Sequence, residues 1–330
     1  MATDQGLTDL VGNHWALPAD GCDWQPITTG LSGNGVWRVA CRSGVYCLRA
    51  FPIRRTSVSR LQQALAWQDR AAQHLDYVPR TIPTRTGNKF VRDRGCYWVL
   101  ETWQSGQPLA PDADENVFSR AIEAVARLHL LWRREWCTKG CSSAVGHRLH
   151  KLGQVPSIIR RLPEHSPCPD LLAQPLYSQL IHMVRDHWTR AHKALAALAH
   201  RRVTMQPIHG DLWRAHVLLG PSRVTGIVDL AACRLDCPVF DLARLVASTY
   251  ATAEPHRWGP FVQAYRSRLP LTPAEEELMQ VLAWTGDVVA ATNWLLWLAI
   301  EKRDFGSSTH VVRERVAWLV QRLPHLSALP

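Results

Sequence analysis

The stretch that decides the fold is Ile208-His209-Gly210-Asp211-Leu212-Trp213-Arg214-Ala215-His216-Val217-Leu218-Leu219. Two shorter stretches follow it, Gly226-Ile227-Val228-Asp229 and Phe240-Asp241-Leu242-Ala243. Asp211 and Asp229 both follow apolar, strand-like residues, in loops that a small β island would hold rigid. Phosphoryl transfer needs two such carboxylates, because one accepts the proton of the attacking hydroxyl and the other holds a metal ion that bridges the phosphates.

The residues around this island predict a mainly helical half. Strand-like pieces at 217–219 and 224–228 lie within a non-helical segment, 203–236. Asp112 with Glu115 predicts a capping-box-like helix start, and Thr272-Pro273 with Glu275 predicts another. The expected helices are 112–131, 171–199 with an interruption near Pro175, 273–302 and 311–323.

The first third of the chain predicts a small lobe of five strands and one helix. The expected strands are 24–29, 35–41, 45–51, 89–92 and 97–103, and the expected helix is 57–75. The fold class is therefore α+β, with a β-rich N-lobe at 1–103, a linker at 104–111 and a helical C-lobe at 112–330. The C-lobe holds the catalytic and metal loops at 203–236. Ligands of two-lobe proteins usually bind in the cleft between the lobes.

These motifs resemble the aminoglycoside phosphotransferase and choline kinase branch of the kinase-like fold. That family carries His-Gly-Asp, an Asn five residues after the Asp, a further Asp about twenty residues on, and an Asp-Leu-Ala helix start. This chain shows all of these elements except the Asn. The resemblance spans about residues 24–250, whereas 251–330 match only as helices. In the first lobe, the resemblance is carried by the segments 31–39, 46–49 and 97–103, the last followed by Gly106. In the second lobe it also includes the segment 126–129.

The resemblance implies an ATP- and Mg²⁺-dependent transfer of a phosphate to a small-molecule hydroxyl. Asp211 would be the catalytic base, and His209 would brace its loop. Asp229 would bind magnesium, and Arg49 would pair with the α- and β-phosphates. Asp241 would cap and anchor a helix beneath the site.

The resemblance also assigns the rest of the nucleotide site, with ATP between the two lobes. Backbone groups of Ser32, Gly33, Asn34 and Gly35 would cover the phosphates, although Gly33 and Gly35 also fit an ordinary hairpin turn. Backbone groups near Glu101 and Trp103 would bond the adenine, although Trp103 also fits a packing role.

Two departures from the family pattern concern charge and metal binding. His216 stands at the Asn position, and magnesium prefers oxygen ligands to imidazole. His216 could therefore bind a softer metal, contact a phosphate, leave one metal unsupported or serve only a structural role. Arg49 stands where protein kinases use Lys, and the helix 57–75 offers no Glu to pair with it. Its polar candidates are Gln62, Gln63 and Asp69.

The charge pattern constrains the partners. The chain has 38 Lys and Arg against 28 Asp and Glu, a net charge of +10, but the basic residues form scattered pairs rather than a block. A polycationic acceptor needs an acidic pocket, and the later helices offer Glu275, Glu276, Glu277 and Asp287. A sugar, an amino alcohol or another metabolite fits equally. Two alternatives stay open, a nucleotide-binding protein without transfer activity and a basic nucleic-acid-binding protein.

Cysteine usage and hydropathy favour a soluble cytoplasmic protein. No two of the nine cysteines have the two-residue gap of a zinc or redox motif, so we expect reduced and mostly buried thiols. The N-terminal residues lack a signal pattern. The longest apolar run, Val288–Ile300, is too short to span a bilayer and predicts a buried helix, so we expect no membrane partner. The sequence does not indicate an oligomeric state.

Overall fold

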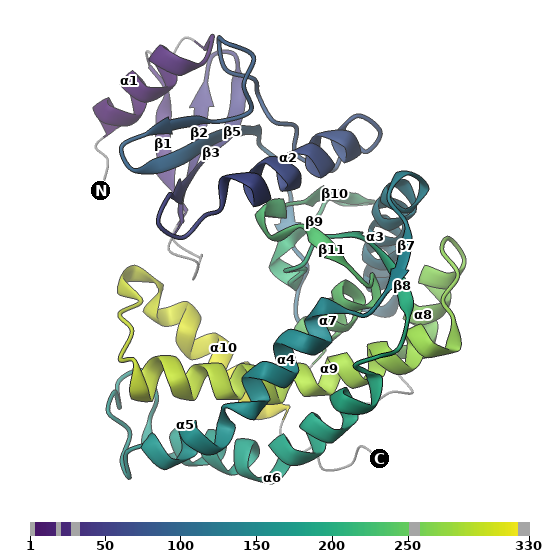
Figure 1. The fold of residues 1–330 in the computed structure, drawn as a ribbon. Helices are drawn as coiled ribbons and strands as arrows, with labels where there is room; N and C mark the ends of the chain where they lie inside the picture. The colour runs from purple at the N-terminus through teal and green to yellow at the C-terminus, as the bar shows by residue number, and fades with distance from the viewer. Residues whose placement is uncertain (1–3, 18–20, 28–33, 251–257, 323–330) are drawn as a thin grey trace. The chain divides into compact units, whose positions relative to one another are not determined.

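The computed structural model describes residues 4–17, 21–27, 34–250 and 258–322 (Figure 1). The chain divides into two compact units by packing. Met1–Gln107 and Leu218–Arg234 form the first unit, and Pro108–Val217 and Leu235–Pro330 form the second.

The first unit contains an antiparallel sheet with a helix on each face. Its elements are α1 (Asp4–His14), β1 (Asp23–Pro26), β2 (Gly35–Cys41), β3 (Gly44–Pro52), α2 (Val58–Ala72), β4 (Val91–Asp93) and β5 (Cys96–Thr102). The strand order is β1-β2-β3-β5-β4. The five expected strands and the expected helix, α2, are thus confirmed, and their ends lie within a few residues of those predicted.

Side-chain alternation along β3 explains the two faces of the sheet. Leu48 packs in a buried cluster with Leu7 and Leu10 of α1, whereas Phe51 packs with Leu61 and Leu65 of α2. Helix α1 was not predicted from the sequence. The indole nitrogen of Trp24 in β1 donates to the hydroxyl of Thr8 at 3.1 Å, a further tie between α1 and the sheet.

Residues 218–234 pack with the first unit, whereas the sequence analysis placed 203–236 in the helical half. The backbone nitrogen of Ile227 donates to the carbonyl of Tyr77 at 2.7 Å, and Ala231 packs against the cluster around Phe51. A segment far along the chain thereby completes the first unit. It is the segment that carries Asp229.

The second unit is mainly helical, as predicted. Its helices are α3 (Glu115–Glu135), α4 (Ser143–Gly153), α5 (Val155–Arg161), α6 (Gln174–Leu198), α7 (Val239–Thr249), α8 (Gly259–Arg266), α9 (Pro273–Trp294) and α10 (Thr309–Gln321). Helix α9 packs against α6 and α7, and α3 packs against α8. The remaining strands form two three-stranded sheets with the orders β10-β9-β6 and β11-β8-β7, of which β10 belongs to the first unit. Their strands are β6 (Gln107–Pro108), β7 (Thr138–Gly140), β8 (Val203–Ile208), β9 (Val217–Leu219), β10 (Val224–Ile227) and β11 (Arg234–Asp236).

The helix ends confirm one predicted cap and correct two other predictions. Thr272 and Glu275 form the expected capping box of α9. The cap of α3 is Asp114, whose side chain accepts from the Val117 nitrogen at 2.9 Å, so the start predicted at Asp112 was wrong. Pro175 lies in the first turn of α6, where its missing N–H costs no hydrogen bond, and it does not interrupt the helix.

Helix α9 continues as a π-helical segment, Leu295–Ile300, which ends at the same residue as the apolar run Val288–Ile300 seen in the sequence. The combined helix Pro273–Ile300 has 28 residues and is long and apolar enough to cross a membrane by length and composition alone. Its most apolar window is 56% buried inside the protein, and it packs against α6 and α7. These contacts are those of a core helix.

The cysteines differ from the expectation of reduced, mostly buried thiols. Cys22 and Cys41 form a disulfide that links the residue before β1 to the end of β2, with 4.5 Å between their Cα atoms. Among the free cysteines, Cys137 and Cys141 are exposed, whereas Cys233 and Cys237 are buried. The expectation was therefore wrong for the disulfide pair and for the exposed thiols.

Candidate active site

The His-Gly-Asp loop of the second unit follows a fully buried strand. All six residues of β8 are buried, and the loop begins directly after Ile208. Gly210 has φ +79°, a left-handed conformation that glycine adopts without steric cost. The strand and this turn set the direction in which the Asp211 side chain leaves the backbone.

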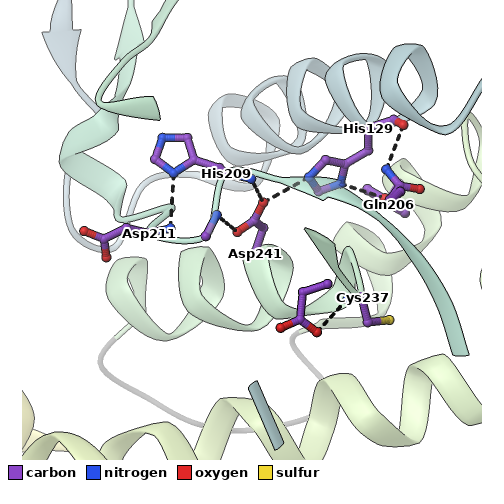
Figure 2. A network of polar contacts seen from close by, with 9 residues as sticks. His129, Gln206, His209, Asp211, Cys237 and Asp241 are labelled. Atoms are coloured by element: carbon purple, nitrogen blue, oxygen red, sulfur yellow. Dashed lines mark hydrogen bonds and ion pairs between the residues drawn. The ribbon is translucent and has the colours of Figure 1, made fainter. Parts of the chain in front are cut away.

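Asp241 holds this loop through the backbone (Figure 2). One carboxylate oxygen accepts from the His209 nitrogen at 2.7 Å, and the other accepts from the Gly210 nitrogen at 2.9 Å. His129 contacts the same carboxylate at 3.1 Å. Burial alone would raise the pKa of Asp241, but the hydrogen bond and charge of His129 outweigh it and lower the pKa, so the carboxylate stays ionised.

Asp241 therefore anchors the His-Gly-Asp loop. It was predicted to cap and anchor a helix beneath the site, and the capping part of that prediction was wrong. The residue lies inside the first turn of α7, whose cap is Pro238. His209, which was predicted to brace the loop, is fully buried, and its Nδ1 accepts from the Asp211 nitrogen at 3.3 Å.

A further layer of side chains positions His129. Its Nδ1 lies 2.9 Å from the Tyr265 hydroxyl, and its carbonyl accepts from Gln206 at 2.8 Å. Gln206 in turn accepts from Arg133 at 3.1 Å. The sequence analysis assigned these residues no role. The Ala-Arg-Leu-His segment at 126–129, which was noted only as part of the family resemblance, was the one indication in the sequence that His129 belongs to this network.

Asp236 ties the end of β11 to the start of α4. Its carboxylate accepts from the hydroxyls of Ser142 and Ser143, both at 2.6 Å, and from the nitrogen of the adjacent Cys237 at 2.8 Å. These contacts satisfy a buried charge close to the first turn of α7. They give Ser142 and Ser143 a structural role.

Asp211 itself is 42% exposed and is paired with a cation. Arg244 of α7 forms an ion pair with Asp211 through Nη2. The backbone carbonyl of Asp211 accepts from Nδ1 of His216 at 2.8 Å. Because a carbonyl only accepts, Nδ1 of His216 carries a proton. His216 also stacks on His209, with ring centroids 5.7 Å apart. His216 thus braces the backbone of the residue predicted to be the base.

In the first unit, the structure brings together two predicted site residues that are 180 positions apart. Arg49 of β3 and Asp229 form an ion pair. The Arg49 side chain is 6% exposed, whereas the Asp229 side chain is 40% exposed. Asp229 has φ +66°, a left-handed conformation that directs the chain into the turn after β10.

The counter-charge that the sequence analysis sought for Arg49 comes from Glu101 and Asp229. Burial alone would lower the pKa of Arg49, but the charges of Asp229 and Glu101 raise it above its ordinary value. Glu101 is buried and accepts from Gln68 of α2 at 3.1 Å. Burial raises the pKa of Glu101 despite the neighbouring Arg49.

None of the helix candidates that the sequence analysis named supplies a charge beside Arg49. Helix α2 contributes the amide of Gln68, which was not among them. Asp69 instead accepts from the Thr81 nitrogen at 3.1 Å and pairs with Lys89 at 2.7 Å. The pairing of β3 with β5 places Glu101 beside Arg49. Glu101 lies opposite Cys47, and Arg49 lies opposite Val99, on the same face of the sheet.

The remaining nucleotide predictions fall partly within the described residues. Ser32 and Gly33 lie outside them. Gly35 begins β2 opposite Ala50, and a Cβ there would collide with the Trp37 ring. The Trp103 nitrogen donates to the Val45 carbonyl at 3.1 Å, so this N–H is already engaged. The roles of Asn34, Gly35, Glu101 and Trp103 at a nucleotide stay predictions.

The donor atoms fit magnesium at one of the two predicted positions. Asp229 offers carboxylate oxygen, the ligand that magnesium prefers, whereas His216 offers an imidazole nitrogen. The described part of the chain contains no group of three or more His, Cys, Asp or Glu side chains that could hold a metal ion. A magnesium ion here would rely on the nucleotide phosphates and water for its other ligands.

A hollow of about 510 Å³ lies elsewhere in the second unit. Its lining includes Asp186, Arg190, Lys193 and Trp284. None of the residues predicted for the site lines it.

Comparisons with known proteins agree on the family and on the fold. The model of the family described as "Phosphotransferase enzyme family" matches residues 23–279. A spectinomycin phosphotransferase, solved with ADP and spectinomycin, has a TM-score of 0.69 and 11% identity, with 97% of this chain and 98% of that chain covered. An amicoumacin kinase, solved with AMP-PNP, Ca²⁺ and the compound designated Ami, has a TM-score of 0.66 and 12% identity, with 96% of this chain and 92% of that chain covered. A choline/ethanolamine kinase family protein from Mesorhizobium loti has a TM-score of 0.56 and 20% identity, with 99% of both chains covered.

Proposed function

Because this chain belongs to the phosphotransferase enzyme family, we propose that it is an ATP- and magnesium-dependent kinase of a small-molecule alcohol. One observation carries the proposal. The buried Asp241 carboxylate binds the two backbone N–H groups directly before Asp211, so the loop is fixed before any substrate arrives. Such preorganisation is what phosphoryl transfer asks of a protein.

The proposed reaction assigns one role to each charged group. The acceptor oxygen bonds to the γ-phosphorus, and the bond from that phosphorus to the β–γ bridging oxygen breaks. Its electron pair leaves on ADP, and the hydroxyl proton passes to Asp211. Arg49 would pair with phosphate oxygens, and Asp229 would hold a magnesium ion, which would supply positive charge to the phosphates.

Two kinds of observation support the proposed binding of a nucleotide and a metal ion. Two of the similar structures were solved with AMP-PNP or ADP, and one of them with Ca²⁺. In this chain, Asp229 is a hard oxygen donor beside a buried cation. The comparisons give no support to the alternative of a nucleotide-binding protein without transfer activity. A cytoplasmic location and the absence of nucleic-acid binding remain proposals.

Isothermal titration of ATP with and without magnesium tests the proposal. We expect wild-type protein to bind, Asp229→Ala to lose the magnesium-dependent part of the affinity, and Asp211→Asn to keep it. Wild-type protein that shows no magnesium-dependent nucleotide binding would contradict the proposed function.

A further inference from the structure

The carboxylate predicted to be the base lies among arginines of the second unit. Arg244 pairs with Asp211, and its guanidinium also lies 5.8 Å from the centre of the Trp213 ring. Arg315 of α10 lies 5.0 Å from the centre of the same ring. Two cations from different helices thus contact the indole two residues after the base.

These cations are close enough to interact with one another. Burial lowers the pKa of Arg315, Asp211 opposes this effect, and Arg244 and Arg214 lower the pKa further. Glu314 and Asp112 act on Arg214, which partly balances its charge. No ion pair within 4.0 Å joins Arg315 to a carboxylate of the described residues. The surroundings of Asp211 therefore carry more positive than negative charge.

The acidic side chains that would suit a cationic acceptor are already engaged. Glu275 accepts from the Thr204 nitrogen at 3.0 Å and forms the capping box of α9. Asp287 pairs with Arg322 at 3.0 Å. Glu276 pairs with Arg266, and Glu277 pairs with Arg201 at 3.3 Å. A polyamine acceptor would find none of these four carboxylates unpaired.

We propose that the acceptor is an alcohol that also carries a carboxylate or phosphate group, and that Arg244 and Arg315 bind this anionic group. The proposal rests on the proposed function, because it assigns the substrate class of the same site. A planar guanidinium binds such an anion through two parallel hydrogen bonds. With the anion held beside Trp213, the hydroxyl of the same molecule reaches Asp211.

The Arg244–Asp211 pair gives this binding a second consequence. An anionic acceptor competes with Asp211 for Arg244, and a half-exposed ion pair is weak enough to exchange. When Arg244 turns to the acceptor, the Asp211 carboxylate leaves its ion pair and can contact the hydroxyl of the acceptor.

The same arginines could instead bind a phosphate of the nucleotide. Both ligands present the same chemistry, so the experiment must separate their sources. Saturation of the nucleotide site with AMP-PNP and magnesium before the anion is added does so. An acceptor subsite stays open to a second anion under these conditions, whereas a nucleotide subsite does not.

The test titrates inorganic phosphate into the free protein and into the protein loaded with AMP-PNP and magnesium, and it follows binding by calorimetry. Variants Arg315→Gln and Arg244→Gln remove the proposed contacts, and Arg313→Gln removes one charge from the exposed side of α10 as the matched control. We expect wild type and Arg313→Gln to bind alike, and each of the other variants to bind at least tenfold more weakly, since charge-assisted hydrogen bonds are lost. The AMP-PNP affinity of all four proteins should agree.

Three outcomes overturn the proposal. Phosphate binding that disappears when AMP-PNP is bound assigns the arginines to the nucleotide. If Arg313→Gln weakens phosphate binding as much as the other two variants do, the effect comes from the overall charge of the protein. If the AMP-PNP-loaded wild type does not bind phosphate at all, the proposed subsite does not exist. A failure of AMP-PNP binding itself would instead contradict the proposed function, so the two failures are distinguishable.

Discussion

Each unit of this protein pairs an aspartate with an arginine, and the two pairs differ in their surroundings. Arg49 is buried and has two carboxylates near it, Asp229 and Glu101. Arg244 is 34% exposed, and its partner Asp211 is 42% exposed. The same type of ion pair therefore behaves differently in the two units. Burial makes Arg49 a fixed part of the structure, whereas exposure allows Arg244 to exchange partners.

The networks behind the two pairs differ in the same sense. Gln68 and Glu101 hold the Arg49 environment from the side chains of α2 and β5. The Asp211 environment is instead held through the backbone, by Asp241 and His216. Fixing the backbone while the side chain stays exposed suits a base that must meet a substrate. Fixing the side chain suits a permanent phosphate contact.

The largest expected effect separates chemistry from binding. Asp211→Asn keeps the shape of the side chain but removes the proton acceptor, so turnover should fall by roughly 10²- to 10⁴-fold. Release of ADP from ATP measures it. Nucleotide affinity should not change, and turnover within threefold of wild type would show that Asp211 is not the base.

The burial of the first pair predicts unequal thiol reactivity. Burial, with help from Glu101, raises the pKa of Cys47 from 9.0 to about 12, which reduces its thiolate fraction on the order of a thousandfold. In the native protein at pH 8, iodoacetamide should therefore modify the exposed Cys137 far faster than Cys47, as peptide mass spectrometry would show. Similar rates would mean that the Arg49 environment is open to water, and denatured protein provides the reference in which both react.

Removal of each arginine compares the two pairs directly. Arg49→Met leaves the buried Glu101 without its cation, so the free energy of unfolding should fall by about 3 kcal/mol. Arg244→Met breaks a half-exposed pair and should cost less than about 1 kcal/mol. Urea denaturation measures both. Equal losses would contradict the distinction between a fixed and an exchangeable cation.

Local signals made much of this fold predictable. Alternation and turn residues predicted the five strands of the first sheet, and Thr272-Pro273 with Glu275 predicted the start of α9. The His-Gly-Asp motif predicted the loop after β8, since its glycine supplies the left-handed turn. These features depend on residues close in sequence.

Features that depend on distant residues were not predictable in the same way. The role of Glu101 beside Arg49 follows from the register between β3 and β5, which the sequence does not state. Asp241 holds the loop only because α7 packs beneath it, so the sequence alone suggested that this residue caps and anchors a helix. Arg244 lies one helical turn after Asp241, yet its contact with Asp211 depends on the same packing.

The last prediction concerns the pH dependence of the buried network. Burial raises the pKa of Glu101 above its ordinary value of 4.5, so over the pH range just above 4.5 the folded protein binds a proton that the unfolded chain has released. The stability that this group contributes is present below pH 4.5 and is lost as the pH rises through the folded pKa. The glutamine side chain of the Glu101→Gln variant cannot titrate. The free energy of unfolding of this variant minus that of wild type should therefore increase with pH above 4.5.

Urea titrations at several pH values measure the difference, with the exposed Glu164→Gln as the control. If the difference instead falls with pH, the attraction of Arg49 outweighs burial, and the pKa of Glu101 lies below its ordinary value.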